Sequence, residues 1–225
     1  MPSQPAMRNT GSLRVAVVGG GIIGLSSALE LRARGADVAI YESGTQLGAG
    51  VTVRAAGMLG AAFEWALEAD QRSLAALARH AGMLWPDFAA RVERNGGGGF
   101  EFSKEGAIVV ARNDGEIEWL ETLAAACQTR GLPVQRLSAA DLKRHEPALT
   151  GPIKAALLLP EDRQVDAQLA LQRLGAALSR AGVGFKFGRK IERIIGGQVF
   201  QMPDGERFDR IVLATGGAAL PAFVA

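Results

Sequence analysis

The chain has 225 residues, 48 % of them apolar and 21 % charged, a composition typical of a globular protein. Its 25 basic and 23 acidic residues give a net charge of +2, too small to indicate a nucleic-acid or membrane-surface partner. The single cysteine, Cys127, excludes an internal disulfide and fits a reducing, cytoplasmic location. Because it lies in an alanine-rich helical stretch, Cys127 is expected to be a small core residue rather than a nucleophile.

The first part of the chain predicts a strand, a helix and a second strand. Residues 1–12 are polar, contain two prolines and are expected to form a disordered tail. Residues 13–18 form a valine-rich apolar run suited to a strand buried on both faces. Apolar residues at helical spacing predict a helix over 22–34, which Gly35 ends, and residues 38–41 form the next strand.

The turn between the first strand and the helix carries Gly19, Gly21 and Gly24 at the G-x-G-x-x-G spacing. In this motif the first glycine permits the tight turn, the second lets a pyrophosphate approach the backbone, and the third lets the helix pack on the sheet. Glu42 follows the second strand, where a carboxylate accepts hydrogen bonds from ribose hydroxyls. The fingerprint therefore predicts a dinucleotide site, with NADP disfavoured by the carboxylate; the alternative is a glycine-rich turn without a ligand.

The rest of the chain mixes helices and short strands. A helix is predicted over 64–94, which Pro86 should kink or split. Further helices are predicted at 114–130, after a capping box formed by Ser138 and Asp141, and at 166–180. Strands are predicted at 106–111, 134–137, 153–159, 183–187, 191–195, 198–202, 206–208 and 210–214, the last of them buried.

This order predicts an α/β protein of two domains. A strand–helix–strand unit, a mixed insert, and a return to a second buried strand imply a discontinuous nucleotide-binding domain at 13–62 and 160–225. The insert at 63–159 would form a second, α+β domain. No apolar run reaches the ~20 residues that a membrane-spanning helix needs.

Three segments together resemble the D-amino-acid oxidase superfamily of FAD-dependent oxidoreductases, most closely its glycine oxidase branch, which is associated with thiamine biosynthesis. They are VVGGGIIGLSSALELRARGADVAIYESG, the loop AAGMLGA at Ala55–Ala61, and LPEDRQVDAQLALQRL, in which Ala167 replaces a proline of the family. The late segment LATGG is similar to the family's strand before a glycine turn at the cofactor.

The resemblance implies FAD as the cofactor, bound by a Rossmann-like domain of the glutathione-reductase type with an inserted substrate domain. It implies pyrophosphate contacts at Ile22, Ile23 and Thr52, and ribose contacts at Glu42 and Ser43. It further implies that the backbone of Ala56, Gly57 and Met58 runs along the isoalloxazine with Leu59 beside it. The Lys190 main chain would contact the adenine, and Thr215 and Gly216 would lie in the glycine turn at the cofactor.

The implied activity is oxidative deamination of a small amino acid or amine, glycine foremost, to an oxo acid, ammonia and hydrogen peroxide. The family's carboxylate-binding arginine and active-site tyrosine would lie beyond Ala225, so a catalytically incompetent FAD-binding fragment is the first alternative. An NAD-dependent dehydrogenase is the second, and AAGML argues against it. Homo-oligomer formation stays open.

Other residues that could carry chemistry are expected to be structural or solvated. His80 and His145 are assigned to the surface, and no cysteine or histidine cluster predicts a metal site. Five acids that could be general bases are expected to be solvated: Glu64, Glu68, Asp70, Glu161 and Asp162.

Overall fold

The computed structural model describes residues 11–48, 50–60, 62–64, 72–96, 98–196, 199–217 and 220–224, without the side chains of 72–76 and 223–224. Two compact units make up the chain: unit 1 comprises Met1–Ala55, Arg91–Gly99 and Ala167–Ala225, and unit 2 comprises Ala56–Ala90 and Phe100–Asp166. The sequence-based domain limits, at 62/63 and 159/160, differ from these limits and stay a prediction. Residues 1–10 of the predicted tail lie outside the described part.

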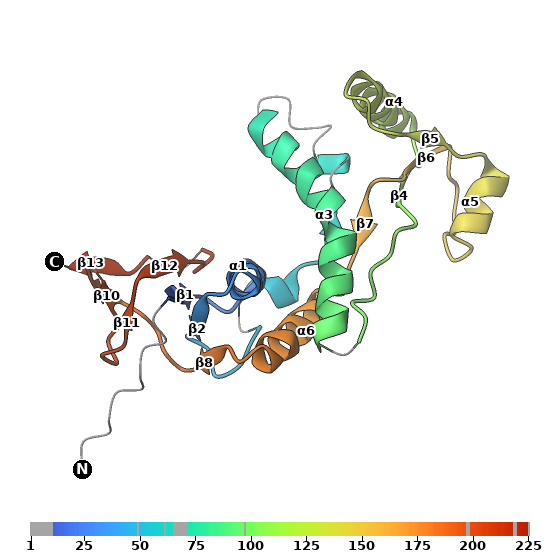
Figure 1. The fold of residues 1–225 in the computed structure, drawn as a ribbon. Helices are drawn as coiled ribbons and strands as arrows, with labels where there is room; N and C mark the ends of the chain where they lie inside the picture. The colour runs from blue at the N-terminus through green and yellow to red at the C-terminus, as the bar shows by residue number, and fades with distance from the viewer. Residues whose placement is uncertain are drawn as a thin grey trace, which may run out of the picture. The chain divides into compact units, whose positions relative to one another are not determined.

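Unit 1 is built on a parallel sheet of four strands in the order β12–β1–β2–β8 (Figure 1). These are β1 (Arg14–Val18), β2 (Asp37–Tyr41), β8 (Gly184–Lys186) and β12 (Arg210–Leu213). The predicted first two strands are confirmed, and β1, which lies between two neighbouring strands, is buried from Val15 to Val18. Burial of β12 was predicted wrongly: as an edge strand of this sheet it is only half-buried.

Two helices of unit 1 pack against one another beside this sheet (Figure 1). They are α1 (Ile22–Ala33), which connects β1 to β2, and α6 (Ala167–Arg180), both close to their predicted bounds. The buried residues of α6 recur at three- and four-residue intervals, the spacing that predicted it. A short 3-10 helix, η1 (Thr52–Arg54), packs on α6 and places Thr52.

A second sheet of unit 1 has the order β11–β10–β9–β13. Its strands are β9 (Arg193–Ile195), β10 (Phe200–Gln201), β11 (Arg207–Phe208) and β13 (Ala222–Val224). The first three confirm predicted strands, whereas β13, which runs parallel to β9, was not predicted.

A polar network at Tyr41 links the two sheets. The Tyr41 hydroxyl donates to Asp204 at 3.1 Å, and the Lys186 ammonium pairs with both Asp204 and Glu206. Tyr41 is buried, and its ring meets Phe208 edge-on with centroids 6.0 Å apart. Burial, reinforced by the carboxylates of Asp204 and Glu206, raises the pKa of Tyr41 above its ordinary value, so the phenol stays a donor.

Unit 2 contains a three-stranded antiparallel sheet in the order β4–β6–β5. Its strands are β4 (Ala107–Ala111), β5 (Gln135–Arg136) and β6 (Ala155–Leu159), each within a predicted strand. A separate two-residue ladder joins β3 (Met58–Leu59) to β7 (Arg163–Gln164), and neither of these strands was predicted.

Two helices of unit 2 confirm predictions made from their sequence patterns. Helix α4 (Asp114–Thr129) buries Leu120, Leu123 and Cys127 in one apolar cluster, so the cysteine is a core residue as expected. Helix α5 (Ala139–His145) begins with the predicted capping box. The Ser138 hydroxyl accepts from the Asp141 amide at 3.1 Å, and the Asp141 carboxylate accepts from the Ser138 amide at 3.2 Å.

Helix α3 (Arg72–Gly96) continues through Pro86, so of the predicted kink or split the split is excluded and the kink stays a prediction; residues 65–71 of the predicted helix lie outside the described part. Proline has no amide hydrogen, which removes the partner of the carbonyl four residues earlier, that of Gly82. Arg163 supplies a substitute: its Nη1 donates to the Gly82 oxygen at 2.8 Å. A side chain from β7 therefore satisfies the carbonyl that the proline orphans.

Candidate cofactor site

Gly19 and Gly24 are required by the backbone of unit 1. Gly19 has φ +115°, and a Cβ there would lie 2.2 Å from the carbonyl oxygen of Ala214, which follows β12. A Cβ on Gly24 would lie 1.9 Å from the carbonyl oxygen of Gly19. The turn and the helix thus pack more closely than any side chain allows, as the fingerprint predicts.

Gly21, at the N-terminus of α1, is less crowded. A Cβ there would approach nothing closer than the Thr52 hydroxyl, at 3.4 Å. The same hydroxyl accepts a hydrogen bond from the Ile22 amide at 3.2 Å, and the Ile23 side chain is 65 % exposed. The first amides of a helix have no partner within it, and they bind phosphate well. The residues here fit a pyrophosphate that would contact these amides and Thr52.

Glu42 lies at the end of β2 with its carboxylate already oriented. Oε2 accepts from the Gly20 amide at 2.7 Å, while Oε1 accepts from the Gly44 amide at 2.6 Å and the Ser43 hydroxyl at 3.2 Å. A carboxylate offers about four acceptor positions, so these three bonds leave room for a ribose hydroxyl. Gly20 was missed in the sequence, although its place between the fingerprint glycines was a signal for it.

Lys190 follows a segment that runs beside Glu42. The Gly188 amide donates to the Gly44 carbonyl at 2.8 Å, and the Arg189 amide donates to the Glu42 carbonyl at 2.9 Å. The Lys190 side chain is exposed, pairs with Glu192 at 2.8 Å, and borders a surface cavity of about 360 Å³. Only its main chain was predicted to contact adenine, and that contact stays a prediction.

Thr215 and Gly216 directly follow β12. The Ala214 amide donates to the Val18 carbonyl at 2.8 Å, which holds this turn beside the glycine turn after β1. Gly216 has φ +63°, a conformation that favours glycine. Unit 1 thus gathers the predicted residues 19–24, 42–43, 52 and 215–216 at the carboxyl ends of adjacent parallel strands, where α/β sheets bind ligands.

The predicted flavin-contacting residues Ala56, Gly57, Met58 and Leu59 belong to unit 2. Gly57 is buried at φ +77°, and its carbonyl accepts from the Val165 amide at 2.9 Å. Ala56 is exposed, and so is Met58, at 64 %. The loop therefore exposes the side chains of Ala56 and Met58, while its backbone is hydrogen-bonded to residues 163–165.

Asp162 corrects one expectation about the acids. It was predicted to be solvated, yet it is 1 % exposed, and its carboxylate accepts hydrogen bonds from the amides of Ala62 at 2.5 Å and Phe63 at 3.0 Å. Glu64 is exposed and Glu161 half-buried, while Glu68 and Asp70 lie outside the described residues. His80 and His145 are both exposed, as predicted.

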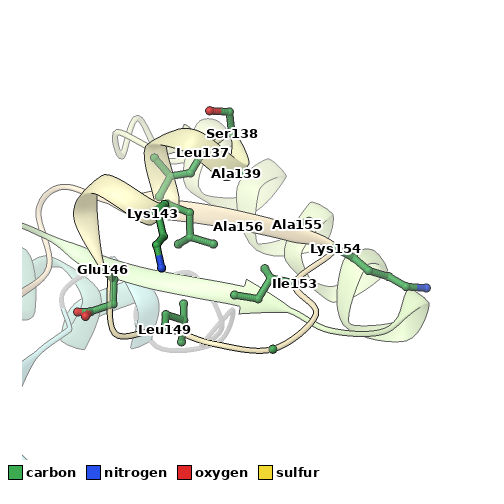
Figure 2. A pocket seen from close by; sticks show the side chains of 12 residues that line it. Leu137, Ser138, Ala139, Lys143, Glu146, Leu149, Ile153, Lys154, Ala155 and Ala156 are labelled. Carbon is green, nitrogen blue, oxygen red and sulfur yellow. The ribbon is translucent and has the colours of Figure 1, made fainter.

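A further cavity in unit 2 lies apart from every predicted site residue. It measures about 240 Å³ and is bordered by α5, β6 and the segment between them, with Leu149, Ile153 and Lys143 among its lining (Figure 2). The Lys143 ammonium donates to the Pro147 carbonyl at 3.3 Å. Among the residues that the structure describes, no group of His, Cys, Asp and Glu is arranged to hold a metal ion, and no helix has the length and apolarity to cross a membrane.

Comparison with known proteins identifies the family. Residues 14–224 match the model of the DAO family, described as FAD dependent oxidoreductase. The chain belongs to this family. The resemblance read from the motifs, the α/β fold and FAD as the cofactor of the DAO family are thereby confirmed.

Two relatives of this DAO-family chain carry the names of oxidases. It is 34 % identical over 169 residues to glycine oxidase of Geobacillus kaustophilus (strain HTA426), covering 75 % of this chain and 44 % of that protein. It is 31 % identical over 170 residues to 4-methylaminobutanoate oxidase (formaldehyde-forming) of Paenarthrobacter nicotinovorans, covering 74 % of this chain and 19 % of that protein.

The solved structure of glycine oxidase from Geobacillus kaustophilus superposes with a TM-score of 0.79 and 30 % identity. The superposition covers 91 % of this chain and 56 % of that one. The DAO-family chain therefore spans about half the length of the glycine oxidases that it matches.

Proposed function

We propose that the protein oxidises the C–N bond of a small amino acid or amine with FAD, and that glycine is its leading substrate. The observation that carries this proposal is the arrangement of Gly21, Thr52 and Glu42 in unit 1, which fits a dinucleotide bearing free ribose hydroxyls. The similarity to glycine oxidase and to 4-methylaminobutanoate oxidase supports an amine as the electron donor.

The two ends of FAD would contact different residues. Glu42 and Ser43 would hold the adenosine ribose, with the Lys190 main chain at the adenine. The α1 amides and Thr52 would hold the pyrophosphate. Thr215 and Gly216 would contact the cofactor from the turn after β12. Ala56, Gly57, Met58 and Leu59 would run along the isoalloxazine, where small residues permit a close backbone approach. Residues 63–159 would supply the substrate domain.

Bound FAD supplies the acceptor for a hydride from the substrate α-carbon and passes the electrons to O₂. The products balance as one amino acid, one O₂ and one water giving one oxo acid, one ammonia and one hydrogen peroxide. The role of the protein is to bind and orient FAD. Glu42 and the helix amides would hold the nucleotide, and the buried Gly57 backbone fixes the loop that would face the ring.

A spectrum and a peroxide assay test this proposal. Protein incubated with FAD and desalted should remain yellow, and glycine should then bleach the 450 nm region under argon and release peroxide in air. N-methylglycine and 4-methylaminobutanoate test whether secondary amines are preferred. L-lactate is the control, because it lacks nitrogen. A colourless protein that binds NAD by calorimetry would contradict the assignment of FAD.

The alternative is that residues 1–225 bind FAD without turnover. It is favoured by the chain's spanning about half the length of the related glycine oxidases. In that case the desalted protein is yellow, yet neither bleaching nor peroxide follows addition of any amine. The two assays together therefore distinguish cofactor binding from catalysis.

A further inference from the structure

Asp162 is the one charged side chain that is buried among the residues described in the chain. It sits in the turn between β6 and β7, where its own amide donates to the Leu159 carbonyl at 3.2 Å. Burying a carboxylate is costly unless hydrogen bonds compensate for the lost water. The two bonds that it accepts, from the Ala62 and Phe63 amides, come from 100 and 99 residues earlier in the chain.

Those two amides directly follow the loop AAGMLGA. The Glu64 amide donates to the Gly60 carbonyl at 3.0 Å, so a helical turn begins here, and its first amides need acceptors from outside. Asp162 provides both acceptors from one carboxylate. It thereby caps this turn as an N-cap residue would, although it lies about 100 residues later in the chain, in the turn between β6 and β7.

The same short stretch around Asp162 also holds the other end of the loop. The Val165 amide donates to the Gly57 carbonyl, Met58 pairs with Gln164, and Leu59 pairs with Arg163. Residues 57–63 are therefore fixed to 162–165 by a ladder that the Asp162 carboxylate closes. A ladder of two residue pairs is marginal by itself, and hydrogen bonds to an ionised carboxylate are about twice as strong as neutral ones.

The surroundings of Asp162 disfavour an ionised carboxylate at this position. Burial raises the pKa of its carboxyl, and the carboxylates of Glu64 and Glu161 add to the rise, while the amides of Ala62 and Phe63 oppose it. Asparagine cannot replace this group, because its amide nitrogen would present hydrogens to one of the two amide donors.

We propose that Asp162 is a positioning residue that sets the loop Ala56–Leu59 in the conformation that contacts the flavin ring. This inference rests on the proposed function. It goes beyond that function because it assigns a role to a residue outside the loop. The Asp162 carboxylate bonds to the backbone amides of Ala62 and Phe63, which follow the loop. Its removal should weaken the flavin half of FAD binding and leave the ADP half intact.

The test compares ADP with FAD on the full chain by calorimetry, with the visible spectrum of bound flavin as a second readout. For Asp162→Asn we expect ADP affinity within about twofold of the wild type and an FAD-to-ADP affinity ratio lowered by about tenfold, the scale of a lost hydrogen bond to a charged group. The spectrum of the bound flavin should move toward that of free FAD.

Two controls separate positioning from stability. Glu161→Gln removes the neighbouring charge but leaves both bonds of Asp162 in place, so it should change neither the ratio nor the spectrum. Leu123→Ala should lower the unfolding temperature of unit 2 by cavity formation, since Leu123 is fully buried, without changing the ratio in the folded protein. If Asp162→Asn does not fold, Ala62→Pro, which deletes one donor amide, must produce the same spectral change.

Each outcome decides between the proposals. A folded Asp162→Asn with an unchanged ratio and spectrum overturns the positioning role. Wild-type protein that binds ADP no more weakly than FAD also overturns it, while the nucleotide site stands. Wild-type protein that binds neither ligand refutes the proposed function itself.

Discussion

Replacing Arg163 with methionine tests how unit 2 tolerates a proline in the middle of α3. The Arg163 guanidinium donates to the Gly82 carbonyl at 2.8 Å, the carbonyl whose partner amide Pro86 lacks. Methionine keeps the length of the stem and removes the donor. In a Pro86→Ala background, the new amide at position 86 can bond to the Gly82 carbonyl instead. Arg163→Met should then lower the free energy of unfolding by less.

The magnitude follows from the geometry. A hydrogen bond from a charged group contributes about 1.5–3 kcal/mol, and because both groups are half-exposed we expect about 1–2 kcal/mol for Arg163→Met. With Pro86→Ala in place, the loss should fall to about 0.5 kcal/mol, a coupling energy of about 1 kcal/mol. The Arg163 guanidinium also lies 5.8 Å from the Phe102 ring centroid, but this contact is lost equally in both backgrounds and cancels.

Urea denaturation followed by tryptophan fluorescence measures these differences. The tryptophans, at positions 65, 85 and 119, all fall within the residue ranges of unit 2, so the signal reports that unit even if the two units unfold separately. Equal losses of stability for Arg163→Met in the two backgrounds would refute the argument that Arg163 compensates for the proline.

Three further predictions concern the cofactor site and the polar network of unit 1. Glu42→Ala should weaken FAD binding by about 1–3 kcal/mol in calorimetry, and an unchanged affinity would exclude a ribose contact. Gly21→Val should abolish FAD binding while the circular dichroism spectrum stays native, because only Thr52 lies near its Cβ; Gly24→Val, whose Cβ meets backbone, should instead unfold the chain. Although burial alone would raise it, bonds from Lys186 and the Glu206 amide hold the pKa of Asp204 below its ordinary 3.8. The stability that Asp204 contributes is therefore present above pH 3.8 and lost as the pH falls through the lowered pKa, so Asp204→Asn should flatten the acid limb of a stability–pH curve, and a limb of unchanged slope would contradict this.

The elements that local pattern determines were predictable from the sequence. Residues 13–41 gave β1, α1 and β2 within one or two residues, because the valine run, the helical spacing and Gly35 act over short distances. The capping box of Ser138 and Asp141 is likewise a contact across three residues. The candidate site residues of unit 1 were predicted from the glycine spacing and from family resemblance, and their contacts with FAD stay a prediction.

What the sequence could not reveal depends on pairing between distant segments. The Asp162 carboxylate was expected to be solvated because nothing near it in the sequence indicates the Ala62 and Phe63 amides that bury it. The donor that bonds to the Gly82 carbonyl in place of the missing Pro86 amide is Arg163, 81 residues from its acceptor. The strands of the β3–β7 ladder are two residues long, too short for an alternating pattern to be recognised.

The pairing of β1 with β12 has a consequence for how the protein is made. The Arg14 amide bonds to Asp209, 195 positions later, so one edge of β1 stays without its partner until nearly the whole of unit 1 has left the ribosome. At about 5–20 residues per second this delay is roughly 10–40 s. During it, the most buried strand of the parallel sheet offers an open edge to other nascent chains. Slow synthesis or a shortage of chaperones should therefore reduce the yield of native protein even when its equilibrium stability is unchanged.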